Sequence, residues 1–186
     1  MGRMGIIIKE LTVLNIFVLD YDVRNCVEYH CNSHVVKMIL EYTQILSTVN
    51  RVCGLDEGYK PTHVRHPCVV WAGECLDNWL YLRTLCEELN NEFKYRFRHS
   101  HKSIFVARSL SEPPLPMLGK LTKQPQAIPN DVKCDDVVVA YRNYYIKYKQ
   151  HLAKWYPREK PWWFTDGVLL KGIYEDESKR NFYFKG

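Results

Sequence analysis

Hydrophobic and polar residues alternate along this chain with two different periods, and these periods predict its elements. The run "LNIFVLD", from Leu14 to Asp20, is short and rich in branched and aromatic residues, which predicts a buried strand. The preceding "IIIKELTV" either pairs with this strand or extends away from it. A short helix is predicted for residues 23–31.

The next segment, 34–52, has one apolar face at helical spacing. This face comprises Val35, Met38, Ile39, Tyr42, Ile45, Leu46 and Val49. The opposite side carries His34, Lys37, Glu41, Gln44 and Thr48. Asn32 or Ser33 is expected to cap this helix. The polar side is either a solvated face or one wall of an active site.

Two longer helices are predicted further along the chain. The first runs from Pro67 to about Arg98, and Gly73 weakens it without ending it. Residues 103–110 form a possible continuation, and residues 111–134 form a proline-rich irregular crossing. The last helix begins near Asp135 and ends before Pro157. Beyond it, Trp162, Trp163 and Phe164 are expected to dock on the body.

These elements predict a mainly α-helical protein with one short strand and a long proline-rich crossing. We expect an extension at residues 1–14, a single compact domain at 15–175 and an exposed tail at 176–186. The length of 186 residues and the hydrophobic content of 46% agree with one globular domain.

Charge and cysteine content bear on the partners of the protein and on its cellular compartment. The net charge of +5 permits a polyanionic partner without requiring one. Seven scattered cysteines indicate reduced thiols rather than a disulfide framework. The N-terminal segment fits neither a signal peptide nor a membrane helix, since Lys9 and Glu10 interrupt it. We therefore expect a soluble protein in the cytoplasm of a cell, with no membrane partner.

Aromatic and basic residues are interleaved in "FKYRFRHSHK" and "YRNYYIKYK". Such segments suit stacking on bases and pairing with phosphates. Core aromatics separated by solvated charges give the same pattern. In the first segment the candidates are Arg96, His101, Lys102 and Ser103. In the second they are Tyr141, Arg142 and Tyr145, whereas Tyr144, Tyr148 and Trp155 are predicted to be core.

Histidine pairs raise the question of a metal. His30 and His34 are four residues apart, and His63 and His66 are three apart, which are spacings that helical ligands use. No HExxH, CxxC or DxD pattern accompanies them, so a metal site is the less favoured reading. Glycine-rich phosphate loops and the GxSxG elbow are also missing. We expect no resident cofactor.

Glu74 is the first candidate for acid–base chemistry. It lies in "WAGECLDNW", one helical turn from Trp71 and Asn78. A carboxyl beside an indole on an apolar stretch can have a raised pKa and act as a general acid. An exposed helical Glu paired with Arg65 or Lys37 is the alternative. Glu41 is a weaker candidate for the same role.

From Asn15 to Phe164 the chain resembles a family of small phage and viral proteins similar to pyrimidine-dimer DNA glycosylases. The resemblance rests on "NIFVLD", a His-Val-Val-Lys-Met helix, "THxxHPC", W-A-x-E-x-x-x-N, "HKS", Q-A-x-P and "AYRNYY". The matching positions are Cys31, His34, Lys37, Glu41, Thr62, His63, His66, Pro67, Trp71, Glu74, Asn78, Tyr95, Arg96, His101, Lys102, Ser103, Gln126, Pro129, Tyr141, Arg142, Tyr145, Lys154 and Trp155.

The resemblance implies a small, basic, all-helical enzyme that excises a damaged pyrimidine. In such glycosylases the N-terminal amine is the nucleophile and a Glu is the essential carboxylate. This chain departs from that pattern, because 14 residues precede Asn15 and no Thr follows Met1. A Schiff base from the terminal amine is therefore in doubt here, while Glu74 or Glu41 remains available to stabilise an oxocarbenium.

The function expected from these observations is cleavage of an N-glycosidic bond at a damaged or modified base. Glu74 would be the carboxylate, His34, His63 and His66 would be acid–base or orienting groups, and Lys37 a possible amine nucleophile. Arg96, Lys102 and Arg142 would hold phosphates, and Trp71 and Tyr141 would stack on bases. The alternatives are a phosphodiesterase or nucleotide hydrolase using the histidines, and a non-catalytic DNA- or nucleotide-binding viral protein.

Overall fold

The computed structural model describes residues 14–171, in which the chain is mainly α-helical, as the sequence predicts. The expectations for "IIIKELTV" and for the tail at 176–186 lie outside these residues. The helices are α1 (Val23–Tyr29), α2 (Asn32–Val52), α3 (Pro67–Ala72), α4 (Leu76–Phe97), α5 (Ser103–Ser109) and α6 (Val137–Tyr148), with short 3-10 turns η1 (Asn130–Val132) and η2 (Gln150–Leu152).

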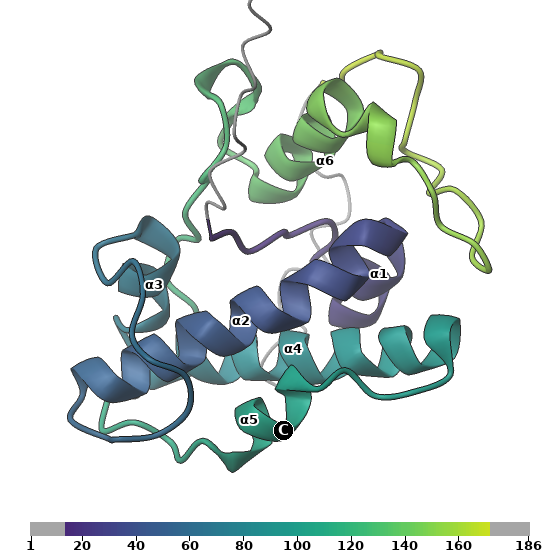
Figure 1. Ribbon diagram of the computed structural model, residues 1–186. Helices are drawn as coiled ribbons and strands as arrows, with labels where there is room; N and C mark the ends of the chain where they lie inside the picture. Colours follow the sequence, from purple (N-terminus) through teal and green to yellow (C-terminus); the bar gives the residue numbers. More distant parts are fainter. Residues whose placement is uncertain (1–13, 172–186) are drawn as a thin grey trace, which may run out of the picture.

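The centre of the molecule is α2, which packs along α4 and also contacts α3 and α5 (Figure 1). Its predicted apolar face is buried along its whole length. The opposite side of α2 is covered in part, because residues 14–20 and α6 lie across it (Figure 1). His34 and Glu41 are buried there, and Thr48 is buried where it bonds to Thr62. Lys37 on the same side stays exposed.

Residues 14–20 are extended and buried, but they form no strand, and no strand occurs among the residues the structure describes. The expected strand is wrong because this backbone bonds to side chains rather than to another backbone. The amide of Leu19 donates to Cys26 Sγ, and its carbonyl accepts from Arg142 at 2.8 Å. Leu14, which we assigned to the extension, is part of the core.

The helix predicted from Pro67 to Arg98 is broken in two. Cys75 is extended between α3 and α4, with φ −154° and ψ 162°. The amide of Leu76 donates to the carbonyl of Pro116 at 2.8 Å, so the proline-rich crossing meets the chain at the break. Two smaller expectations also fail, because Cys31 occupies the N-cap of α2 and α6 ends at Tyr148.

The proline-rich crossing is irregular, as expected, and it is held at several points. Leu118 N–H donates to Asp77 Oδ2 at 2.7 Å, and Thr122 N–H donates to Asn78 Oδ1 at 3.1 Å. Of the three aromatic residues expected to dock after α6, Trp163 and Phe164 are buried. The third, Trp162, is exposed.

No helix in residues 14–171 combines the length and apolar character needed to cross a membrane. All seven cysteines are free thiols, and Cys134 is the exposed one.

Candidate active site

A cavity of about 500 Å³ opens where α2, α6, the extended segment and the crossing meet. Helix α2 contributes Lys37, Met38 and Glu41 to its wall, and the start of α3 contributes His66 and Pro67. Its lining consists of Asn15, Phe17, Lys37, Met38, Glu41, His66, Pro67, Gln126, Ala127, Ile128, Pro129, Lys133, Tyr144 and Lys149. Five segments that are separate in the sequence therefore build one site.

Glu41 is the one carboxylate among these lining residues, and it is only 5% exposed. Lys37, one turn earlier on α2, places its Nζ 3.1 Å from Glu41 Oε1. The other oxygen, Oε2, accepts the backbone N–H of Asn15 at 3.2 Å. Burial raises the pKa of the Glu41 carboxyl, and Lys37 and the Asn15 amide oppose that rise.

Asn15 connects the carboxylate to the rest of the site. Its side-chain Nδ2 donates to the carbonyl of Ala127 at 3.0 Å, which ties it to the crossing. Its Oδ1 accepts the hydroxyl of Tyr141 at 2.6 Å, which ties it to α6. Burial raises the pKa of Tyr141 well above its usual value, so this hydroxyl remains a donor. The backbone that faces Glu41 is thus held from two sides.

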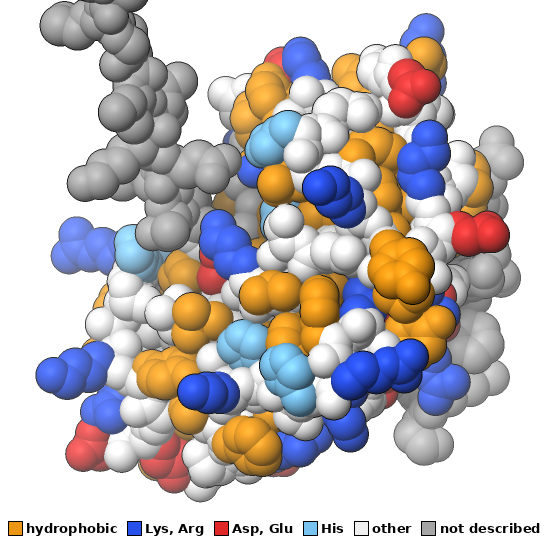
Figure 2. Space-filling view, turned by 45° about the vertical axis from the view of Figure 1, so that its right-hand side comes forward, with side chains coloured by type: hydrophobic (Ala, Val, Ile, Leu, Met, Phe, Trp, Pro, Cys, Tyr) orange, Lys and Arg blue, Asp and Glu red, His pale blue; other side chains and the backbone are white. Residues whose placement is uncertain are grey.

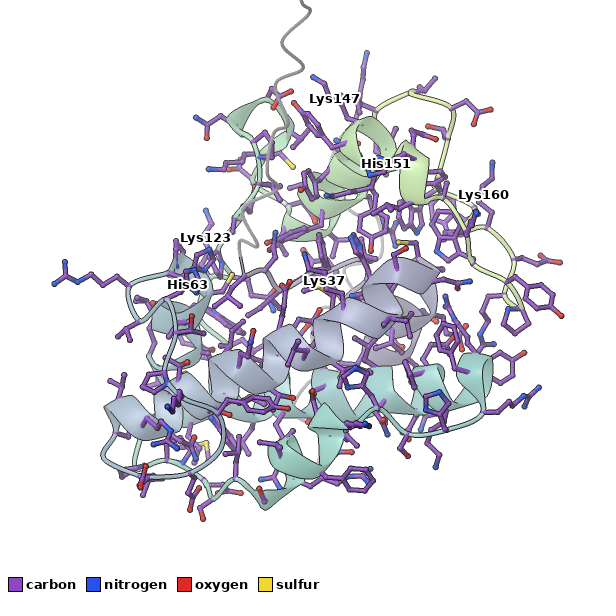
Figure 3. The ribbon with its side chains drawn as sticks, viewed as in Figure 1. Lys37, His63, Lys123, Lys147, His151 and Lys160 are labelled. Carbon is purple, nitrogen blue, oxygen red and sulfur yellow. The ribbon has the colours of Figure 1, made fainter. Side chains whose placement is uncertain are left out.

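Basic side chains surround the carboxylate. Lys37, Lys133, Lys149 and His66 all line the cavity. Figure 3 places Lys37 in the middle of this face, with His63 and Lys123 on one side and His151 and Lys160 on the other. Figure 2 shows the molecule turned from the view of Figure 1, and on this surface Lys and Arg side chains outnumber Asp and Glu side chains. A negatively charged substrate is favoured at such a surface.

His34 lies beneath the site rather than in it. Its ring stacks on Phe17 at 4.5 Å, and its Nδ1 is 2.5 Å from the hydroxyl oxygen of Tyr145. Burial, more than any neighbouring charge, lowers its pKa to about 2. A histidine that stays neutral throughout the physiological range supports Phe17 and α6 but is a poor general acid.

His66 lines the cavity, whereas His63 is not among the lining residues. His66 is half-buried, and its Nδ1 caps α3 by accepting the N–H of Cys68 at 3.2 Å. Burial and then His63 lower the pKa of His66. His63 is exposed, has φ +49° and bonds to Thr62 at 2.6 Å. Within residues 14–171, no three His, Cys, Asp or Glu side chains are grouped as metal ligands would be.

Glu74 does not face this cavity. It is exposed after α3, and its Oε2 accepts the hydroxyl of Thr122 at 2.5 Å. Trp71 is buried, with its indole N–H directed to Thr122 O, so it is not available to stack on a base. Asn78 is also buried and bonds to Trp71 O and to Thr122. These three residues fasten the crossing to α3 and α4.

The expected phosphate-binding residues around residue 100 also have structural partners. Arg96 is buried and bonds to Glu92 at 2.6 Å and to the carbonyl of His30 at 2.9 Å. Ser103 is buried and accepts the hydroxyl of Tyr59. His101 caps α5 by accepting the N–H of Ser103 at 3.1 Å. Lys102 alone of the four is exposed, away from the cavity.

On α6 the predicted faces are reversed. Tyr141, Arg142 and Tyr145 are buried, and the guanidinium of Arg142 pairs with Asp20 at 2.9 Å. Tyr144, which we predicted to be core, lines the cavity instead, and Tyr148 is exposed. Arg142 is therefore a core ion pair rather than a phosphate ligand.

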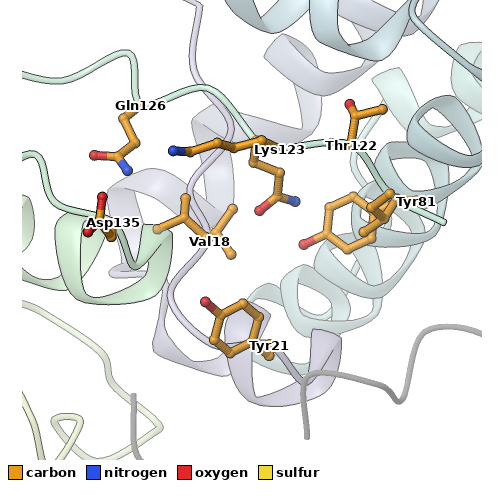
Figure 4. Close-up of a pocket in the computed structure, with 10 residues that line it drawn as sticks. Val18, Tyr21, Tyr81, Thr122, Lys123, Gln126 and Asp135 are labelled. Atoms are coloured by element: carbon orange, nitrogen blue, oxygen red, sulfur yellow. The ribbon is translucent and has the colours of Figure 1, made fainter. Parts of the chain in front are cut away.

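A second, smaller cavity of about 260 Å³ lies on the other side of the extended segment. Figure 4 shows Tyr21, Tyr81, Lys123 and Asp135 around it. It contains no carboxylate and amine held together by a described contact. The cavity at Glu41 is the better candidate for chemistry.

The fold and the site define a helical protein with a shielded carboxylate inside a basic cavity. Comparisons with protein-family models, with curated proteins and with solved structures found no match. The site residues that the sequence did not single out are Asn15, Lys133, Tyr144 and Lys149. A pattern along one helix cannot reveal them, because they come from other segments.

Proposed function

We propose that this protein cleaves an N-glycosidic bond at a damaged or modified base in DNA, with Glu41 as the essential carboxylate. The observation that carries the proposal is the pair of Lys37 Nζ and Glu41 Oε1, 3.1 Å apart in the basic cavity. An amine and a carboxyl in contact are the two groups that a glycosylase with a covalent intermediate requires.

The backbone at Asn15 adds support. In the glycosylases to which the resemblance points, the N-terminal amine is the nucleophile. Here the nitrogen of Asn15 is an amide, since Leu14 precedes it, and it lies 3.2 Å from Glu41 Oε2. The primary amines among the described lining residues are those of Lys37, Lys133 and Lys149. Lys37 is the one in contact with Glu41, so we assign it the role of nucleophile.

The proposed reaction begins with a proton transfer from the Lys37 ammonium to Glu41, with which it is in contact. The neutral amine attacks C1′, the C1′–N bond breaks, and its electron pair leaves with the base. Glu41 returns the proton to the departing base. A proton then passes from the attached nitrogen to the ring oxygen as the sugar opens, leaving a Schiff base between Lys37 and C1′.

The basic cavity wall supplies binding rather than chemistry. Lys133, Lys149 and His66 line the cavity, and we assign them the phosphates next to the target nucleotide. Tyr144 offers a ring on which an extruded base can stack. We place this activity inside a virus-infected cell, acting on DNA.

Strand scission on end-labelled duplex DNA tests the proposal, with ultraviolet lesions, uracil or an abasic site as substrates. Alkali-labile breaks that persist in EDTA are expected from the wild type. Glu41→Gln should reduce them by about 100-fold or more, and Lys37→Ala should abolish the adduct that borohydride traps. Glu112→Gln, an exposed carboxyl far along the chain, is the matched control.

Three results would contradict this proposal. Breaks that are retained in Glu41→Gln and lost in Glu74→Gln would show that Glu74 is the essential carboxylate. Breaks that vanish in EDTA would favour a metal-dependent phosphodiesterase. Tight DNA binding with no product from any substrate would favour a non-catalytic binding protein.

A further inference from the structure

Residues 154–164, here named the aromatic arm, follow η2 and lie against the junction of α1 and α2. The N–H of Asn32 donates to Lys154 O at 2.7 Å, and its side chain donates to Tyr156 O at 3.1 Å. The indole N–H of Trp155 donates to Tyr29 O at 2.8 Å. These bonds fix the path of the arm on the body.

Aromatic side chains of the arm divide into two groups. Trp155, Trp163 and Phe164 are buried and anchor it. Tyr156 and Trp162 are 84% and 74% exposed, although each neighbours a buried residue. Large aromatic groups left in water next to a firm anchor contribute little to folding, so they indicate a surface that binds something.

The charges around these rings are mostly positive. Lys154 and Lys160 are exposed cations of the arm, against Glu159 as its acidic residue, whereas Arg158 is paired with Glu28 and Glu92. The buried guanidinium of Arg142 lies 5.5 Å from the centre of the Trp162 ring and holds that ring from behind. Figure 3 shows Lys160 on the arm at one side of the face that carries Lys37. The exposed cations of the arm that an anion could reach are therefore Lys154 and Lys160.

The arm is also continuous with the active-site cavity. Lys149 lines the cavity, and His151 and Lys154 follow it through η2 to the start of the arm. In Figure 3 His151 lies above Lys37, and Lys160 of the arm lies to the right of both. A strand leaving the cavity would pass over basic residues before it reaches Tyr156 and Trp162.

We propose that the aromatic arm binds a single-stranded segment of nucleic acid, with Tyr156 and Trp162 stacking on unpaired bases. Lys154 and Lys160 pair with the phosphates of that segment. Separate rings interspersed with charges match the alternation of base and phosphate along a strand. This interaction goes beyond bond cleavage at Glu41, because binding at the arm requires neither Glu41 nor Lys37.

Fluorescence anisotropy with a labelled single-stranded oligothymidylate and the full chain tests this proposal. Trp162→Ala and Tyr156→Ala should each weaken binding by roughly 5- to 100-fold, the range for loss of one stacked base. Phe105→Ala removes another exposed aromatic residue, on α5, and should leave the Kd unchanged. Trp162→Phe should retain most of the affinity, because it keeps a stacking ring.

Several outcomes would overturn the proposal. One is a Kd for Trp162→Ala equal to that of the wild type, with the fold verified by circular dichroism. Another is an equal loss of affinity in Phe105→Ala. A third is a Trp162→Ala variant that binds anionic phospholipid vesicles more weakly than the wild type but binds the oligonucleotide equally well. That result would show that the arm binds membranes. The oligonucleotide carries no damaged base and the assay reports binding alone, so failure of the cleavage proposal remains distinguishable.

Discussion

Arg96 illustrates how one residue can satisfy a motif for a reason other than ligand binding. Its guanidinium donates to Glu92 Oε1, to the carbonyls of Glu28 and His30, and to Asn32 Oδ1. It thereby joins α4 to the junction of α1 and α2. Each of these acceptors is left without that donor if the guanidinium is removed, and buried polar groups are costly to leave unpaired.

Arg96→Ala should therefore lower the free energy of unfolding by about 3–5 kcal/mol. Urea denaturation measures this loss. Arg158→Ala is the control, because Arg158 pairs with the same Glu92 but is partly exposed, and its removal should cost less. Unchanged stability together with weaker DNA binding in Arg96→Ala would instead support the phosphate-binding role that the sequence suggested.

At the scale of the element, the loop between α2 and α3 depends on two glycines that differ in their surroundings. Gly54 and Gly58 have φ +87° and +67°, a region that other residues rarely adopt. A Cβ at Gly54 would meet open space. A Cβ at Gly58 would meet the side chain of Ser47 on α2 and lie 2.7 Å from Leu110 Cδ2. Of these two glycines, only Gly58 brings the loop into close contact with α2.

Gly58→Ala should consequently destabilise the protein more than Gly54→Ala. Backbone strain costs both variants about 1 kcal/mol, and overpacking adds about 1–3 kcal/mol at position 58. Thermal unfolding followed by circular dichroism compares the two variants directly. Equal melting temperatures would show that the loop moves away from α2 at little cost.

At the scale of the whole molecule, the burial of two histidines near residues 14–20 makes the free energy of unfolding depend on pH. His30 and His34 are both buried beneath residues 14–20 and α6. Burial lowers the pKa of His30 to about 4 and that of His34 to about 2, against 6.5 for an exposed histidine. The unfolded chain therefore binds protons below pH 6.5 that the folded protein does not.

Stability should fall as the pH decreases from 6.5 towards 4, with a slope approaching about 2.7 kcal/mol per pH unit from the two histidines together. Urea unfolding at pH 7.5, 6.5 and 5.5 measures this fall. His34→Gln should show a shallower fall, whereas His151→Gln, which changes an exposed histidine, should match the wild type. Identical slopes for His34→Gln and the wild type would refute the assignment.

Local patterns in the sequence were sufficient to predict that the protein is mainly helical. They also predicted that the apolar face of α2, from Val35 to Val49, is buried. Side chains at helical spacing share a face whatever the rest of the chain does, so that burial follows from the segment itself. The proline-rich crossing is equally local, because its prolines cannot continue a helix. The irregular path from residue 111 to 134 was therefore predictable.

Contacts between distant segments decided the site. Glu41 is shielded by Asn15, 26 residues away, and His34 by Tyr145, 111 residues away. The helix after Pro67 breaks where Pro116 O meets Leu76. On α6, Tyr141 faces the core and Tyr144 the cavity because of where residues 14–20 lie. The sequence by itself determined that the protein is mainly helical and which face of α2 is apolar. The tertiary structure determined where the later helices break and which polar side chains lose water, since both depend on partners that no local pattern contains.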